Sequence, residues 1–89
     1  MFDESFDNGK SQRTKNSRGI DFIESRAVWA DPEAIEGPAD TVAGEVRWLK
    51  VGRIGGKIWT VGFTVREAGI RIFMARPARK DEKEVYNGH

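Results

Sequence analysis

The sequence predicts an α+β domain in which two N-terminal helices pack on a three-stranded antiparallel β-meander, followed by a short C-terminal helix. Two observations predict this fold. Apolar residues recur at helical spacing in residues 20–32, whereas apolar and polar residues alternate from residue 45 onward, as in half-buried strands. Two turn signals, Gly55–Gly56 and the segment REAG at 66–69, divide the alternating half into three strands.

Each N-terminal helix has a recognisable end. The first is expected from about Asn8 to Ser17, because Gly19 is a favourable stop for a helix. The second is expected over residues 20–32. Asp21 caps its start, with Glu24 three residues on as in a capping box, and a proline ends it.

Two segments are expected to lie outside these helices and strands. Residues 1–6 form either a short edge strand or a frayed end. The segment at 31–44 is polar and contains two glycines and two prolines, so it reads as a loop between the helices and the sheet.

The strand predictions follow from the alternation. Strands are expected at about 45–54, 57–66 and 69–76, and a helix at about 79–86. In the third strand, Ile70, Ile72 and Met74 are expected on one face. The sheet must be covered on at least one face, and the two N-terminal helices supply that cover.

Length and composition set further limits. The chain has 89 residues, which is enough for one domain spanning 1–89 with a modest core. No apolar run approaches the ~18 residues that a membrane span needs, so no membrane partner is expected. The chain has no cysteine for disulfides or thiolate ligands, which fits a cytoplasmic protein.

Charge is distributed unevenly along the chain. Residues 1–44 carry five Lys/Arg against nine Asp/Glu, and residues 45–89 carry ten against five, so the two halves have net charges of −4 and +5. The basic half suggests an anionic partner such as RNA. A solvated surface with uneven charges explains the same numbers.

The basic residues near the predicted sheet form the candidate site. Arg47, Arg53, Arg71 and Arg76 fall in or beside strands, and Glu45 lies two residues before Arg47 on the same strand face. A guanidinium in a sheet needs a carboxylate partner or an open face. These residues therefore form either a structural Glu–Arg pair or a cationic surface for phosphate, to which Arg offers a planar fork of donors.

Other classes of site are disfavoured. His89 is the only histidine and is expected in a terminal tail, which leaves no His-based triad or zinc site. The glycines of GRIGG lack the Lys-Ser/Thr of a P-loop, and no cluster of carboxylates resembles a two-metal site. We therefore expect neither a metal nor a cofactor.

Five short motifs occur in an order that matches a known family. They are FDNGK at 6–10, RGIDF at 18–22, WADP at 29–32, GEVRWLKVGRIGG at 44–56 and RIFMARPARKDEKEVY at 71–86. On these motifs, nearly the whole chain resembles the BrnT-type ribonuclease toxins of bacterial type II toxin–antitoxin modules. The resemblance implies a RelE-like fold, an endoribonuclease that blocks translation, an RNA substrate and a BrnA-like antitoxin. Operator DNA would be bound only indirectly, through that antitoxin.

The resemblance also implies roles for residues of this chain. Metal-independent cleavage of RNA needs a base for the 2′-hydroxyl, cations for the transition-state phosphate and an acid for the leaving oxygen. The predicted charge stabilisers are Arg47, Arg71 and Arg76, the predicted base is Glu45, and Tyr86 orients a group or stacks on a base. Further RNA contacts are predicted for Lys10, Arg18, Arg53, Arg79 and Lys83.

One geometric condition applies to two of these arginines. An ordinary strand places Arg71 and Arg76 on opposite faces, because five positions separate them. Both serve one site only if the strand ends or bulges near residues 75–77. Alternatively, one of the two is structural and pairs with Glu45 or Glu82.

The chain departs from the family pattern at three places. The family's Lys-His-Gly is Ser17-Arg18-Gly19 here, the Ser before its Ala-Arg is Met74, and the Thr at its helix start is Arg79. A guanidinium stays protonated and cannot replace a histidine as acid or base. The alternative function is therefore a degenerate toxin or a small RNA-binding module that retains only antitoxin or RNA binding.

Overall fold

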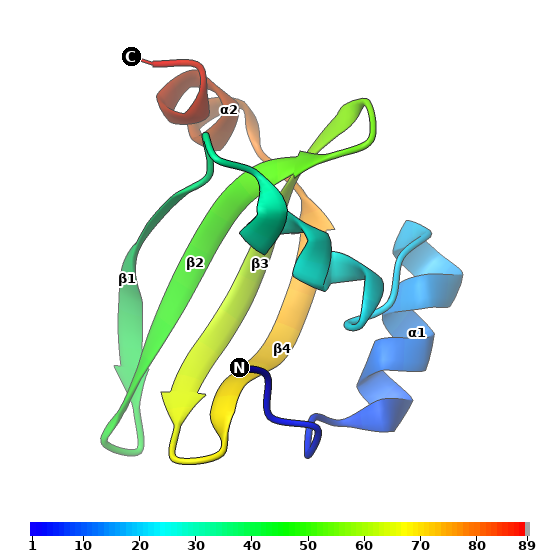
Figure 1. The fold of residues 1–89 in the computed structure, drawn as a ribbon, viewed down its shortest axis with the longest axis vertical. Helices are drawn as coiled ribbons and strands as arrows, with labels where there is room; N and C mark the ends of the chain where they lie inside the picture. The colour runs from blue at the N-terminus through cyan, green and yellow to red at the C-terminus, as the bar shows by residue number, and fades with distance from the viewer. Residues whose placement is uncertain (89) are drawn as a thin grey trace.

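A four-stranded antiparallel sheet, in the order β1-β2-β3-β4, forms the centre of the protein (Figure 1). The structure is a computed structural model that describes residues 1–88, so the prediction for His89 lies outside the described residues. Along the chain, the elements are α1 (Asn8–Arg18), the 3₁₀ helix η1 (Glu24–Ala30), β1 (Ile35–Val42), β2 (Glu45–Ile54), β3 (Lys57–Arg66), β4 (Gly69–Pro77) and α2 (Lys80–Tyr86). The architecture is α+β, but the predicted count of three strands is wrong.

Strand β1 occupies the segment for which the sequence predicts a loop. It pairs antiparallel with β2, with an irregularity after Pro38. Proline is tolerated there because β1 is an edge strand, and one side of an edge strand needs no N–H donor. Ala43 and Gly44 have positive φ values of 52° and 80°, and they join β1 to β2 as a tight two-residue hairpin. The turn residues of this segment thus lie within a hairpin rather than a loop.

The inner face of the sheet carries the main core. Trp59, Val61 and Phe63 of β3 point to this face and pack with Phe22 and Val28 from the segment around η1. In Figure 1, η1 crosses the sheet on this side, and its contacts are with β2 and β3. The predicted cover of the sheet therefore comes mainly from the region of the second helix.

The outer face carries the intervening residues of β3, namely Ile58, Thr60, Gly62 and Thr64. Helix α2 covers the Ile58 end, where Val51, Ile58 and Ala78 form a second, smaller core cluster. The Thr64 end lies beside the starts of β2 and β4, at the opposite end of the strands from α2.

Helix η1 is shorter than the predicted second helix and is a 3₁₀ helix. Phe22, Ser25 and Val28, each three positions apart, are fully buried. This spacing fits the three residues per turn of a 3₁₀ helix. The predicted capping box is confirmed, because Asp21 Oδ1 accepts from Glu24 N at 2.7 Å and Glu24 Oε1 accepts from Asp21 N at 3.0 Å.

A bulge in β4 changes which side chains share a face. Ile72 lies opposite Phe63 and Met74 lies opposite Gly62, so Phe73 is an extra residue in β4. The predicted alternation along this strand is therefore wrong at Met74, which shares the outer face with Gly62. The bulge also places the ring of Phe73 close to Gly62.

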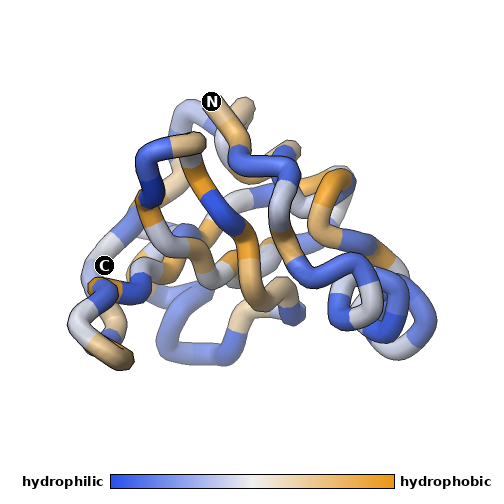
Figure 2. Tube along the Cα trace, turned by 90° about the horizontal axis from the view of Figure 1, so that it is seen from below, coloured by the Kyte–Doolittle hydropathy of each residue, from blue (hydrophilic) through white to orange (hydrophobic). Residues whose placement is uncertain are grey.

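Helix α1 lies beside β4. It is polar along its whole length, and its coil is blue to white in the hydropathy colouring of Figure 2. Its only buried residue is Ser11, whose hydroxyl accepts from Phe22 N at 2.9 Å. Asp7 caps its start by accepting from Lys10 N, and Gly19 ends it with a φ of 101°, as predicted. None of the helices in residues 1–88 is long and apolar enough to cross a membrane.

The N-terminal residues run along the edge of β4. Phe2 forms an isolated parallel bridge with Ile70, and backbone hydrogen bonds of 2.8 Å join Ile70 to Met1 and Asp3. The segment is therefore neither the edge strand nor the frayed end that were the predicted alternatives, because it is ordered along β4 but forms only an isolated bridge. It protects one edge of the sheet and leaves β1 as the other.

Candidate functional site

Four of the ten predicted site residues meet in one pocket at the Thr64 end of the outer face. This polar pocket has a volume of about 260 Å³ and is lined by Lys10, Val42, Ala43, Glu45, Arg47, Thr64, Arg71 and Phe73. Helix α1, the β1–β2 hairpin, and the ends of β2, β3 and β4 therefore each contribute to it.

The cations of the polar pocket are only partly neutralised. Among residues 1–88, neither Lys10 nor Arg71 forms a salt bridge, and Arg71 donates only from Nε, to Ser5 O at 3.2 Å. Arg47 pairs with Asp40 through two bonds of 3.0 and 3.1 Å. Both side chains of that pair are well exposed, so the pair is screened by water and weak. An incoming anion can therefore compete for all three cations.

The carboxylate in the polar pocket is bound by a different arginine from the one predicted. Glu45 accepts two hydrogen bonds, of 2.9 and 3.0 Å, from Arg66 rather than pairing with Arg47. The hydrogen bond from Arg66, together with the charges of Arg66 and Arg71, lowers the pKa of Glu45 below its ordinary 4.5. Glu45 is therefore ionised at neutral pH but weakly basic.

An aromatic ring organises the cations of the polar pocket. The guanidinium of Arg47 lies 4.9 Å from the centroid of the Phe73 ring, and the ammonium of Lys10 lies 5.6 Å from it. Both distances fall within the range of cation–π attraction. A Cβ at Gly62 would come within 2.7 Å of the Phe73 ring, so the ring keeps this position only because residue 62 is glycine.

Thr64 is a polar residue of the pocket that is not among the residues predicted from the sequence. Its side chain is buried, with the residue 4% exposed, and its Oγ1 has no hydrogen-bond partner within the described residues. A buried hydroxyl without a partner costs about 1–3 kcal/mol. Such a group is an exception in folded proteins and calls for an explanation.

Arg76 lies at the other end of the outer face in a nearly buried ion pair. Its guanidinium donates to both oxygens of Glu82 at 2.7 and 2.9 Å, and the two side chains are 14% and 15% exposed. Glu82 Oε1 also accepts from Thr60 and from Arg79 N. The pair ties β4 to α2, which favours the structural alternative for Arg76. Its catalytic role stays a prediction.

Tyr86 also ties α2 to the rest of the fold. Its hydroxyl donates to Asp31 Oδ2 at 2.6 Å, and the same oxygen accepts from Arg53 N at 2.8 Å. The hydrogen bond to Asp31 raises the pKa of Tyr86, and the hydrogen bond from Tyr86 is the main cause of the lowered pKa of Asp31. Tyr86 is not part of the polar pocket, so its predicted part in RNA chemistry also stays a prediction.

The other predicted RNA contacts are scattered. Arg18 is exposed at the end of α1, Arg53 is exposed near Tyr86, and Arg79 and Lys83 are exposed at α2. Helix α1 contains a denser group of four Lys/Arg and no Asp/Glu, of which only Lys10 and Arg18 were predicted as RNA contacts. That composition was visible in the sequence, whereas only the sheet register brings Thr64 and Phe73 to the pocket.

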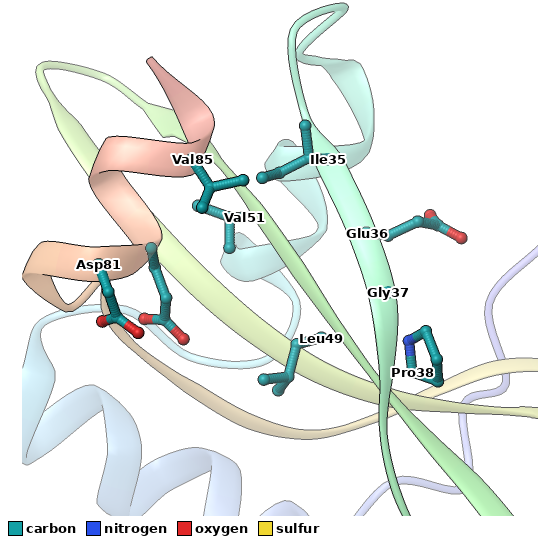
Figure 3. A pocket seen from close by; sticks show the side chains of 9 residues that line it. Ile35, Glu36, Gly37, Pro38, Leu49, Val51, Asp81 and Val85 are labelled. Carbon is teal, nitrogen blue, oxygen red and sulfur yellow. The ribbon is translucent and has the colours of Figure 1, made fainter. Parts of the chain in front are cut away.

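A second depression, of about 330 Å³, lies between α2 and the β1–β2 edge (Figure 3). In this depression, Val85 of α2 points towards Ile35 and Val51. The rim of the depression carries the carboxylates of Asp81 and Glu36. An apolar floor with an acidic rim repels phosphate, so this groove does not suit a nucleic acid. Within residues 1–88, no group of three His, Cys, Asp or Glu side chains is arranged to hold a metal ion.

The fold and the polar pocket define a small α+β protein with a cationic site of the kind that binds phosphate groups. The family described as "Ribonuclease toxin, BrnT, of type II toxin-antitoxin system" matches residues 6–82. The chain therefore belongs to this family, which confirms the resemblance found in the sequence. Membership implies an RNA substrate and an antitoxin partner. None of the curated proteins matches the chain.

Proposed function

We propose that the protein is an endoribonuclease toxin that binds RNA at the polar pocket, cleaves it without a metal ion and thereby inhibits translation in the cytoplasm. One observation carries the proposal. The predicted site residues Lys10, Glu45, Arg47 and Arg71 come from three motifs, at 6–10, 44–56 and 71–86, and the fold brings them together around one pocket. Two of these cations have no ion-pair partner among the described residues, which suits them to an RNA phosphate.

Each charged residue of the polar pocket has a separate proposed role in cleavage. Lys10 and Arg71 bind the phosphate, and Arg47 joins them as the phosphate displaces Asp40. Glu45 is the carboxylate lining the pocket and is the proposed base for the 2′-hydroxyl. Its lowered pKa makes proton transfer to it unfavourable, which predicts slow cleavage.

A non-enzymatic role is the second candidate, and one observation favours it. The pKa of Glu45 is lowered and the pKa of Arg47 is raised, both away from neutrality, whereas an efficient acid or base requires a pKa near neutrality. Arg18 also replaces the family's histidine. A degenerate toxin would keep the cationic pocket for RNA or antitoxin binding and lack cleavage.

The antitoxin is proposed to be BrnA-like and to cover the polar pocket with an acidic or amphipathic segment. The excess of cations around the pocket supports this, because an acidic segment would pair with them and block RNA. Operator DNA would then be bound through the antitoxin. If the bound antitoxin leaves RNA binding unchanged, occlusion of this pocket is wrong.

Induced expression in bacteria, with growth and total RNA followed over time, tests the function. The active toxin is expected to stop growth and fragment RNA, and co-expression of the antitoxin restores growth. The purified protein is expected to cut RNA equally well with and without EDTA. RNA binding without fragmentation would establish the non-enzymatic role instead.

A further inference from the structure

The buried hydroxyl of Thr64 has a donor hydrogen and no acceptor among the described residues. Thr64 lies directly opposite Arg71 in the β3–β4 pairing, so the two side chains share the outer face. Both line the polar pocket. The Thr64 hydroxyl lacks any hydrogen-bond acceptor, and the Arg71 guanidinium, which donates only to Ser5 O, has no carboxylate partner among residues 1–88. A negatively charged acceptor would supply what both groups lack.

The charges around the hydroxyl define what that acceptor can be. The lining of the polar pocket contains three cations, Lys10, Arg47 and Arg71, and one carboxylate, Glu45. Cations are therefore in excess around the hydroxyl. An internal phosphodiester of RNA carries one negative charge and several acceptor oxygens, so it matches both the charge and the missing acceptor.

We infer that Thr64, Arg71 and Lys10 form a seat for a single phosphodiester group, in which the Thr64 hydroxyl donates to a non-bridging oxygen. The inference deepens the proposed function, from which it takes only the identity of the ligand as RNA. The hydroxyl is buried in this structure, so the inference requires side chains of the pocket to shift and expose it when the phosphate binds. Binding of the phosphate thus gives the buried Thr64 hydroxyl the hydrogen-bond acceptor that it lacks.

The seat also gives the pocket a means of discrimination. Glu45 stays ionised beside it, held by Arg66, and repels any additional negative charge. A phosphodiester with one charge is therefore favoured over a terminal phosphate with two. The expected ligand is an internal linkage of a single strand rather than a phosphorylated end.

The test compares the wild type with Thr64→Val and Thr64→Ser by thermal unfolding and calorimetry. The probes are a 2′-deoxy dinucleoside monophosphate, which has one charge and cannot be cleaved, and inorganic phosphate at pH 8, with sodium chloride at matched ionic strength as the control. The wild type is expected to bind the dinucleoside monophosphate more tightly than inorganic phosphate. Thr64→Val should bind it about tenfold or more weakly, because it lacks one donor to a charged acceptor. Thr64→Ser should keep most of the affinity.

Without a probe, Thr64→Val should melt at the same temperature as the wild type or higher, because it removes an unsatisfied hydroxyl. A lower melting temperature for Thr64→Val, equal affinities of Thr64→Val and wild type, or no probe binding by the wild type would each overturn the seat. RNA cleavage is measured on the same samples. Probe binding without cleavage would refute the enzymatic function and leave the seat intact, whereas cleavage with a dispensable hydroxyl would refute the seat alone.

Discussion

Arg71 and Arg76 lie on the same face of the sheet, although five positions separate them along β4. Arg71 is opposite Thr64 and Arg76 is opposite Thr60, and both threonines belong to the outer face. The extra residue in the strand is Phe73, which lies before residues 75–77, where a bulge or strand end was the condition for both arginines to serve one site. The two arginines are nevertheless about 13 Å apart along the strand, so one phosphate does not reach both.

The position of Phe73 depends on Gly62, and Gly62→Ala tests this dependence. The added methyl group would come within 2.7 Å of the Phe73 ring, so the ring must move and carry Arg47 and Lys10 with it. We expect the free energy of unfolding to fall by about 1–3 kcal/mol, as measured by urea denaturation, and RNA binding to weaken.

Gly56→Ala is the matched control for this substitution, because a Cβ at residue 56 meets nothing within 4 Å. It should change stability by no more than about 0.5 kcal/mol. Adding Phe73→Leu to Gly62→Ala should restore part of the stability but not the RNA binding, since the ring that organises the cations is lost. Equal stability of Gly62→Ala and Gly56→Ala would contradict this account.

Tyr86→Phe tests whether Tyr86 is structural or catalytic. The substitution removes the 2.6 Å hydrogen bond to Asp31, so the melting temperature should fall at neutral pH. The pKa of Tyr86 is raised above 10 in the folded state, so its contribution is fully present below pH 10 and is lost as the pH rises further. The difference in melting temperature between wild type and Tyr86→Phe should therefore shrink above pH 10. A catalytic role requires the folded variant to lose specific activity at neutral pH.

Much of the fold is predictable from local patterns, and β1 shows why the rest is not. The strands at 45–54 and 57–66 are predicted at their observed bounds, because alternation and the Gly55–Gly56 turn are local signals. Strand β1 is mostly exposed, so its sequence has no apolar alternation to reveal it. Its pairing with β2 is a tertiary interaction that overrides the turn propensity of Gly37 and Pro38.

The candidate site likewise contains residues that the sequence predicts and residues that it does not. Glu45, Arg47 and Arg71 were predicted from residue type and motif, and they meet in the pocket because the strand register aligns them. Thr64 carries no signal in the sequence, since its importance lies in a missing hydrogen bond. The bulge at Phe73 also has no signal in the sequence, because one extra residue does not change the apolar character of the strand.

The ion pair between Arg76 and Glu82 makes stability depend on acid. The hydrogen bonds from Arg76 are the main cause that lowers the pKa of Glu82 from 4.5 to about 2. Because the pKa of Glu82 is lower in the folded state than in the unfolded state, the ionised carboxylate stabilises the folded protein above pH 4.5. This contribution is lost as the pH falls towards about 2. Glu82→Gln should therefore be less stable than the wild type by about 3 kcal/mol at neutral pH, and the difference should vanish near pH 2.

Urea denaturation of both proteins between pH 2 and pH 7 measures this difference, in which the contributions of the other carboxylates cancel. Arg76→Ala should also be destabilised at neutral pH, because it leaves the nearly buried carboxylate of Glu82 without its cation. A stable, correctly folded Arg76→Ala protein that has lost only its toxicity would instead support the catalytic prediction for Arg76.

Arg71→Ala is the sharpest test of the polar pocket. Arg71 makes no salt bridge within residues 1–88 and donates only one hydrogen bond, to Ser5 O, so its loss should leave the circular dichroism spectrum unchanged. Removing one donor to the transition-state phosphate typically slows cleavage about 10²–10³-fold. Arg71→Lys should recover only part of the rate, because an ammonium lacks the planar fork of donors. Lys80→Ala removes an exposed cation at the α2 end of the fold and should cut RNA at the wild-type rate. If Arg71→Ala and Lys80→Ala cleave RNA equally fast, net positive charge rather than this pocket explains RNA binding.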